Sequence, residues 1–281
     1  MLIESLNNKL QAKLSHCVDI INRAGKVAIG FSGGVDSALL LALATRTLGS
    51  ENILAVTATG LFHPESETES ARQFADKLGV DLVEINFDNL DDNRVLDNPK
   101  DRCYWCKQVI FKEIARRAKL KKINAVASGA NLDDLDDYRP GSRAENELNI
   151  IKPLQQAGLT KSDIREISQA MNLDTHDKPS KACLASRVPY GVRLEKNILA
   201  RIDKAEQGLI NIGFPQCRVR DHGTVARVEV PSNQLDNAFA LRDKIIQIVK
   251  QAGYNYATLD LEGFRSGAMN ETLNLNSTGV N

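Results

Sequence analysis

The sequence predicts an α/β fold in which helices cover both faces of a parallel sheet, followed by a smaller C-terminal α+β domain. Apolar strand-like segments alternate with helical segments over the first 176 residues, which is the pattern of parallel strands joined by crossover helices. A loop rich in Pro, Ser and Gly interrupts this pattern at 177–191, and an alternating, hairpin-like segment follows at 217–230. We therefore expect domains at 1–176 and 177–268, with a polar, disordered tail at 269–281.

The individual elements follow in order from the hydrophobic pattern. Short apolar runs predict strands at 26–31, 53–58, 81–87 and 123–128. Helical periodicity predicts helices at 35–48, 67–79 and 107–119, the last beginning directly after Cys106. Thr160 followed by Asp163 is a capping pattern that starts a further helix. In the second domain we expect a helix at about 195–211 and a hairpin that turns at 221–223.

Composition narrows the class of protein. Lys+Arg and Asp+Glu both total 36, so the net charge is zero and binding of nucleic acid by bulk charge is disfavoured. The longest uniformly apolar run, 38–44, is too short to cross a bilayer, and no leader pattern precedes it. Five unevenly spaced cysteines do not suggest a disulfide framework. We expect a cytoplasmic protein without nucleic-acid or membrane partners.

The segment SGGVDS, residues 32–37, lies where the first strand passes into a helix. Gly33 and Gly34 allow backbone N–H groups to turn toward an anion, and the helix N-terminus adds its positive dipole. Ser32 and Ser37 can donate hydroxyl hydrogen bonds, and Asp36 can hold Mg²⁺ against phosphate oxygens. The alternative is an ordinary tight turn. No Gly-Lys-[Ser/Thr] follows, so the segment is not a Walker A loop.

The segment NPKDRCYWCK, residues 98–107, places Cys103 and Cys106 around Trp105, the only tryptophan. This spacing alone allows a redox pair, half of a zinc site, part of an iron–sulfur site, or two buried thiols. Trp105 could stack on a planar cationic ring or belong to the core. Cys17 and Cys217 have no motif around them and are expected to be small buried residues.

Further polar candidates follow the fourth predicted strand, at the sheet edge where open α/β folds bind ligands. In the segment 128–141 the candidates for nucleotide or Mg²⁺ contact are Asn131, Asp134, Asp137 and Arg139, any of which could instead be a solvated loop charge. In the second domain, the two-residue period of a strand places Arg218 and Arg220 on one face. Two adjacent guanidinium groups suit a phosphate or paired carboxylates. Arg187, four residues after Cys183, could steady the same anion.

The SGGVDS segment resembles the pyrophosphate loop of the PP-loop ATP pyrophosphatases, whose fold is of the adenine nucleotide alpha hydrolase type. Within that superfamily, the segments 98–107, 128–141, 158–165, 177–191 and 218–230 resemble those of the LarE family in the same order. The similarity covers about residues 26–265. It implies an ATP-dependent sulfur transferase rather than a kinase.

The resemblance implies the substrate, the cofactors and the catalytic residues. ATP and Mg²⁺ would adenylate a carboxylate of pyridinium-3,5-biscarboxylic acid mononucleotide, and sulfur would displace AMP to give a thiocarboxylate for the nickel-pincer nucleotide. One branch of the family sacrifices the sulfur of the cysteine that matches Cys183. A second branch has cysteines matching Cys103, Cys106 and Cys183 and is thought to hold a [4Fe–4S] cluster. This chain has all three, so we expect the cluster, whose fourth iron would be open to sulfide.

Other functions remain alternatives. A PP-loop tRNA thiolase combines adenylation with cysteine chemistry, but it would need a basic RNA-binding surface that the neutral composition does not suggest. A non-catalytic ATP- or iron–sulfur-binding regulator would not need paired arginines. The resemblance also suggests a sulfide or other sulfur donor as a partner and a homo-oligomer, with a hexamer as the suggested size.

Overall fold

A computed structural model describes residues 6–60, 62–88, 90–135, 140–179 and 183–265 of the chain. The chain forms two compact units. The first comprises Met1–Leu90 and Asp101–Lys181, and the second comprises Asp91–Lys100 and Ala182–Asn281. The chain therefore leaves the first unit for ten residues and returns to it directly before the two cysteines of the 98–107 segment. The expected tail at 269–281 lies outside the described residues.

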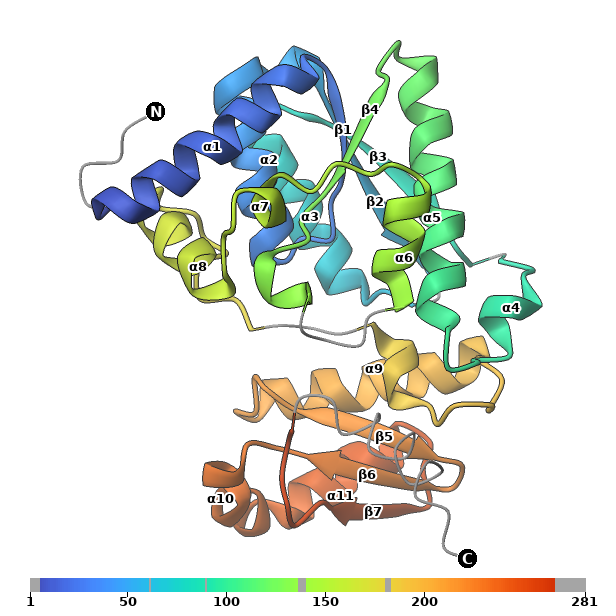
Figure 1. The fold of residues 1–281 in the computed structure, drawn as a ribbon. Coiled ribbons are helices and arrows are strands. Elements are labelled where there is room, and N and C mark those ends of the chain that lie inside the picture. The colour runs from blue at the N-terminus through green and yellow to red at the C-terminus, as the bar shows by residue number, and fades with distance from the viewer. Residues whose placement is uncertain (1–5, 61, 89, 136–139, 180–182, 266–281) are drawn as a thin grey trace, which may run out of the picture. The chain divides into compact units, whose positions relative to one another are not determined.

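The first unit is built on a four-stranded sheet (Figure 1). Its strands are β1 (Val27–Gly30), β2 (Ile53–Thr59), β3 (Asp81–Asn86) and β4 (Ala125–Ser128). They are all parallel and stand in the order β3-β2-β1-β4. The predicted parallel sheet is confirmed, and each strand lies within two residues of its expected bounds, because short strand-like runs between loops and turns are local signals.

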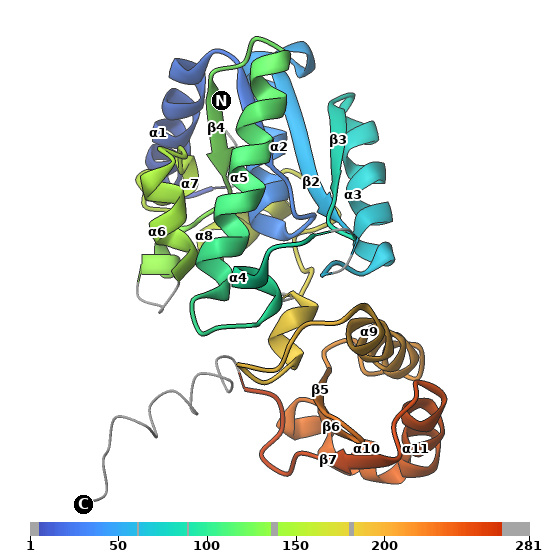
Figure 2. The ribbon, with the colours of Figure 1, turned by 90° about the vertical axis from the view of Figure 1, so that its right-hand side faces the viewer.

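Helices cover both faces of this sheet, as Figures 1 and 2 show. They are α1 (Asn8–Ala24), α2 (Val35–Leu48), α3 (Glu65–Leu78), α5 (Arg102–Leu120), α6 (Pro140–Glu147), α7 (Pro153–Gln156) and α8 (Lys161–Ala170), with short 3₁₀ turns at Ser50–Asn52 and Leu132–Leu135. One apolar core lies under α1, α2 and α8, and a second lies under α5. Within the described residues, no helix is both long and apolar enough to cross a membrane.

The strand order creates a switch point in the first unit. The chain proceeds outward from β1 through β2 to β3, and then returns to the other side of β1 at β4. Connections of this kind leave a crevice at the carboxyl ends of the two strands where the direction reverses. The segment 32–37 follows β1, and the segment that begins at Gly129 follows β4, so both predicted nucleotide segments flank this point.

The second unit contains a three-stranded sheet in the order β5-β6-β7. Its elements are α4 (Asn93–Leu96), a 3₁₀ turn at Leu184–Arg187, α9 (Lys196–Asn211), β5 (Arg218–His222), β6 (Val225–Glu229), a 3₁₀ turn at Ser232–Gln234, α10 (Leu235–Ala240), α11 (Arg242–Gln251) and β7 (Tyr256–Leu259). β5 and β6 form the expected antiparallel hairpin, and β7 joins β6 in parallel. One sheet face carries Val219 and Val228 into an apolar core beneath α9 and α11.

Residues 91–100 are held in the second unit by hydrogen bonds that involve backbone groups. Asn98, which is completely buried, donates its side-chain amide to the carbonyl oxygens of Val188 and Pro189 at 3.2 and 2.8 Å. The backbone N–H of Leu194 donates to the carbonyl oxygen of Leu96 at 2.7 Å. Asn98, the first residue of the segment 98–107, therefore fixes the start of that segment to the second unit.

Two helices differ from the sequence expectation. α5 begins at Arg102, so both Cys103 and Cys106 lie inside its first turns and not before it. The expectation was wrong because the residues before Lys107 show no apolar periodicity. α1 was not predicted, although it buries Leu10, Leu14 and Ile21 along one stripe.

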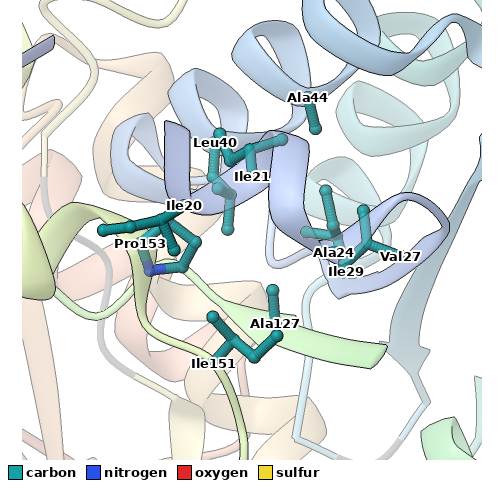
Figure 3. Close-up of a pocket in the computed structure, with 10 residues that line it drawn as sticks. All are labelled: Ile20, Ile21, Ala24, Val27, Ile29, Leu40, Ala44, Ala127, Ile151 and Pro153. Carbon is teal, nitrogen blue, oxygen red and sulfur yellow. The ribbon is translucent and has the colours of Figure 1, made fainter. Parts of the chain in front are cut away.

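A small apolar cavity of about 10 Å³ lies between α1, α2 and the sheet (Figure 3). Its lining residues are Ile20, Ile21, Ala24, Val27, Ile29, Leu40, Ala44, Ala127, Ile151 and Pro153. A space of this size and composition gives a water molecule no polar partners, so it stays dry. The packing against β1 is therefore close to complete, and side-chain truncation there removes contacts that nothing replaces.

We expect Ile29→Ala to reduce the stability of the first unit by about 3 kcal/mol, because it adds a void beside an existing cavity. Ile29 is completely buried, whereas Leu120 is 71% exposed. Leu120→Ala is the matched control, and its effect should stay within about 0.5 kcal/mol. Urea-induced unfolding followed by circular dichroism measures both changes, and equal losses in the two variants would contradict this account of the core.

Candidate functional site

We call residues 32–37, which join β1 to α2, the phosphate loop. Hydrogen bonds that involve its own hydroxyl groups hold this loop in shape. The Ser37 hydroxyl oxygen accepts the backbone N–H of Ser32 at 3.2 Å and lies 3.1 Å from the Ser32 hydroxyl. Gly33 has a φ of 71°, which only glycine adopts readily, and Gly34 is the N-cap of α2. Because a glycine N-cap has no side chain, the first N–H groups of α2 are not capped from that position. An anion can therefore bind there.

Gly129, directly after β4, packs on this loop without an intervening side chain. A Cβ atom at this position would lie 2.8 Å from the backbone nitrogen of Ser37 and 3.1 Å from the carbonyl carbon of Asp36. Such distances are too short for any residue but glycine, so the close approach of the two segments depends on it. Gly129 belongs to the segment 128–141, but no local pattern in the sequence indicates this packing role.

Asp36 lies in the first turn of α2, where its carboxylate has two partners within the first unit. One oxygen forms an ion pair with the ammonium group of Lys161. The other accepts a hydrogen bond from the side-chain amide of Asn131 at 3.4 Å. The structure therefore brings Asn131 to the phosphate loop, together with a lysine that the sequence analysis did not single out.

The other candidates after β4 have different positions. Asp134 is nearly buried, and one of its oxygens accepts the backbone N–H of Asn131 at 2.9 Å. Asp134 thus shapes the loop that carries Asn131. Asp137 and Arg139 lie outside the described residues.

A second lysine reaches the phosphate loop from the end of the first unit. The Lys178 ammonium group donates to the carbonyl oxygen of Gly33 at 3.0 Å and pairs with Glu67 at 2.6 Å. Arg165 fixes the backbone around Lys178 by donating to the carbonyl oxygen of that residue at 2.9 Å. Lys178 stands within the 177–191 motif, but the pattern alone does not indicate which lysine folds toward the loop.

Cys103 and Cys106 are one helical turn apart at the N-terminal end of α5. Cys103 is exposed and Cys106 is partly buried. The guanidinium group of Arg102 donates to the Cys103 sulfur at 3.7 Å. Arg102 and the N-terminus of α5 therefore place positive charge beside the Cys103 sulfur. The indole N–H of Trp105 donates to Asp101 at 3.0 Å, so this ring is held at the same helix end.

None of the five cysteines forms a disulfide bond in the described structure. Burial raises the pKa of Cys17 to about 12, and Cys217 is also buried, so neither is suited to react as a thiolate. Cys183 is exposed and precedes the 3₁₀ turn Leu184–Arg187 in the second unit. Among the described residues, no group of three or more His, Cys, Asp or Glu side chains is arranged to hold a metal ion.

The second unit contains two buried arginine–glutamate pairs. Arg187 donates to both carboxylate oxygens of Glu206 at 2.8 and 2.9 Å. Arg220 donates to both oxygens of Glu229 at 2.9 Å. All four residues are less than a tenth exposed, and such bidentate pairs have the geometry that makes burial of charge tolerable.

These arginines also hold the turn that carries Cys183. Arg187 donates to the carbonyl oxygen of Cys183 at 3.1 Å, and Arg220 donates to that of Ser186 at 2.7 Å. The Ser186 hydroxyl donates to the Cys183 carbonyl at 2.8 Å. The backbone beside Cys183 is therefore fixed by two guanidinium groups from different elements.

Arg218 is the third buried arginine of this cluster. It donates to the carbonyl oxygen of Cys217 at 2.7 Å, and its guanidinium carbon lies 4.9 Å from the ring centre of Phe264. Burial, and then repulsion from Arg187, lower the pKa of Arg218 to about 10. The negative charge of Glu206 acts in the opposite direction and raises the pKa of Arg218.

The chain is similar to known proteins over most of its length. It is 34% identical over 264 residues to the pyridinium-3,5-bisthiocarboxylic acid mononucleotide synthase of Lactiplantibacillus plantarum, covering 94% of this chain and 96% of that protein. It is 35% identical over 268 residues to an uncharacterised protein of Synechocystis sp., covering 94% and 99%. A family model for NAD synthase matches residues 3–101, the part that contains the phosphate loop.

We expect Arg187→Ala to destabilise the second unit by about 3–5 kcal/mol, because it leaves the Glu206 carboxylate buried without its cation. The double variant Arg187→Met, Glu206→Gln removes both charges and keeps an acceptor for the backbone N–H of Val219, which Glu206 binds at 2.9 Å. It should recover at least half of the lost stability. Urea unfolding compares the two proteins, and a double variant no more stable than Arg187→Ala would show that the ion pair is not the cause.

Proposed function

The chain belongs to the LarE family of PP-loop, ATP-dependent sulfur transferases, and we propose that it converts a carboxylate of pyridinium-3,5-biscarboxylic acid mononucleotide to a thiocarboxylate. The observation that carries this proposal is the end-to-end similarity to a named synthase, which spans both units. The preformed phosphate loop at the switch point supports the ATP-dependent step.

The reaction divides into activation and sulfur transfer. A carboxylate oxygen of the substrate attacks the α-phosphorus of ATP, the bond to the β-phosphate oxygen breaks, and pyrophosphate leaves. A sulfur nucleophile then attacks the acyl carbon, and AMP departs with the original carboxylate oxygen. Ser32, Gly33, Gly34 and Ser37 would hold the phosphates through their N–H and hydroxyl groups, which stabilises the charge that develops on the leaving pyrophosphate.

Asp36 would hold the Mg²⁺ that accompanies ATP. Its carboxylate is an oxygen ligand of the type that Mg²⁺ prefers, and it stands at the helix N-terminus where phosphates would bind. One carboxylate together with phosphate oxygens and water is a common Mg²⁺ coordination. The bound ion would neutralise part of the phosphate charge, and the protein contributes the position of the carboxylate. Asn131 and Asp134 would fix the loop beside it.

Cys103, Cys106 and Cys183 would together hold a [4Fe–4S] cluster. In support, Cys103 and Cys106 lie one turn apart, Cys103 is exposed, and Arg102 contacts its sulfur. Along the chain, Cys103 comes three residues after Lys100, and Cys183 two residues after Lys181, the points where the chain passes between the units. The cluster would supply a site for the sulfide that is transferred.

The buried arginine cluster would bind the negative charges of the substrate. Arg187, Arg218 and Arg220 place three guanidinium groups around two glutamates beside the turn that carries Cys183. Arg187 and Arg220 would orient the turn through their hydrogen bonds to the carbonyl oxygens of Cys183 and Ser186, and Arg218 would contact the anion directly. Trp105 would stack on the pyridinium ring, and Asp137 and Arg139 remain proposed contacts of the nucleotide or substrate.

We place this activity in the cytoplasm, with a sulfide or another sulfur donor as its partner and a homo-oligomer, up to a hexamer, as its assembly. The need of the proposed reaction for intracellular ATP supports this location.

Asp36→Asn should keep the fold and lower the rate of pyrophosphate release at least a hundredfold, because a neutral amide is a poor Mg²⁺ ligand. A coupled pyrophosphate assay with the pyridinium dicarboxylate nucleotide measures the rate, and an unchanged thermal melt is the control for folding. Wild-type release by the variant would contradict the role of Asp36. Release stimulated by tRNA and not by the nucleotide would overturn the proposed substrate.

Alanine replacement of any one of Cys103, Cys106 and Cys183 should have two effects. It should abolish the broad absorption near 400 nm, roughly where iron–sulfur charge transfer lies, and it should abolish multiple-turnover sulfur transfer. Cys17→Ala is the control and should change neither. Sacrifice of Cys183 gives a different result, since the wild-type protein would then lose about 34 Da as dehydroalanine forms. Mass spectrometry after reaction distinguishes the two mechanisms: an unchanged mass with several products per chain supports the cluster, and stoichiometric dehydroalanine at position 183 excludes it.

A further inference from the structure

The carboxylate proposed to hold Mg²⁺ already has a cation beside it. Lys161 contacts Asp36 through its ammonium group, while the Asn131 amide occupies the other carboxylate oxygen at 3.4 Å. The side chains of Lys161 and Asp36 are 29% and 23% exposed, so the pair is partly shielded from solvent. A metal ion that approaches Asp36 must therefore displace an ammonium group and not only water.

The backbone of Lys161 is held independently of this ion pair. Thr160 and Asp163 form a complete capping box around it at the start of α8. Lys13 pairs with Asp163 at 2.6 Å, and the backbone N–H of Lys161 donates to Asp133 at 2.9 Å. Because these contacts dock the helix, the Lys161 side chain can leave Asp36 without moving α8.

A lysine suits an exchange of this kind. Its ammonium group is a compact, strongly hydrated charge on a flexible stem, so it can change partners without the loss of a fixed planar geometry. When Mg²⁺ and nucleotide arrive together, the displaced ammonium group gains phosphate oxygens as new acceptors. When Mg²⁺ arrives alone, the ammonium group has no comparable partner.

We propose that Lys161 is an exchangeable counter-ion of Asp36. It neutralises Asp36 before nucleotide binds and thereby prevents a metal ion from binding there without nucleotide. When metal and nucleotide bind together, the ammonium group moves to the phosphates. This inference rests on the proposed role of Asp36 as the Mg²⁺ ligand. It makes the binding of metal and nucleotide mutually dependent, so each increases the affinity for the other by the same factor.

Mn²⁺, which replaces Mg²⁺ at oxygen sites and is visible by electron paramagnetic resonance, tests the proposal without nucleotide or turnover. We expect Lys161→Met to bind Mn²⁺ about tenfold more tightly than the wild type, which is the effect of relieving one competing charge. Lys161→Arg keeps the charge and should bind Mn²⁺ as weakly as the wild type does. Lys161→Gln serves as a second neutral variant if Lys161→Met does not fold.

Lys13→Met is the matched control, because Lys13 also contacts the start of α8 but pairs with Asp163 and not with Asp36. Its Mn²⁺ affinity should equal that of the wild type. Addition of Asp36→Asn to Lys161→Met should abolish the gained affinity, which assigns the ion to Asp36. With ATP present, the gain in Mn²⁺ affinity from Lys161→Met should shrink or reverse, since the wild-type lysine then contributes to phosphate binding.

An unchanged Mn²⁺ affinity in both neutral variants would overturn the proposal, as would an equal increase in Lys13→Met. A gain that survives Asp36→Asn would also overturn it. These outcomes are separate from the proposed reaction: a chain that releases no pyrophosphate with the pyridinium nucleotide can still show the exchange, and an active chain can fail to show it.

Discussion

The direct packing of Gly129 on the backbone of Ser37 is the constraint on which the first unit depends. It exists because β4 pairs with β1 in parallel, so the segments that follow the two strands leave the sheet side by side. Only a residue without a Cβ allows this approach. The same approach brings Asn131 to the N-terminus of α2, where its amide contacts Asp36. The backbone hydrogen bond from Lys161 to Asp133 then holds the start of α8 beside the same loop.

Two lysines from other parts of the unit place positive charge beside the phosphate loop. Lys161 pairs with Asp36, and Lys178 lies between Gly33 and Glu67. A site that must accept a highly charged nucleotide gains from cations that are already near, since they need no long-range rearrangement when the phosphates arrive. Both lysines pair with a carboxylate, but Lys161 pairs with Asp36, the proposed Mg²⁺ ligand, whereas Lys178 pairs with Glu67 in α3. This difference makes Lys161 the candidate for exchange.

In the second unit, buried arginines hold the short turn beside Cys183 in a fixed position, although Cys183 itself is exposed. Arg187 and Arg220 donate to the backbone of that turn while their other N–H groups are bound by buried glutamates. Burial of these charges has a desolvation cost that hydrophobic residues would avoid. The benefit is a fixed geometry. Each bidentate pair fixes one guanidinium plane, so Arg187 holds the Cys183 carbonyl and Arg220 holds the Ser186 carbonyl in defined positions. Glu206 and Glu229 are themselves buried members of this arrangement.

The sequence by itself determined the parallel sheet, the phosphate loop, the hairpin and the family, because buried strands, glycine-rich turns and ordered motifs are local signals. It did not reveal that α5 begins before Cys103, since the polar residues there carry no periodicity. Nor could it reveal the partners of the site: Lys161 and Lys178 stand 125 and 145 residues from the atoms they contact. Many lysines in the chain are locally equivalent, so the sequence does not show which of them reaches the loop. The pairing depends on the strand order and on how closely two backbones approach, and only the tertiary structure determines both, because they involve residues far apart in the chain.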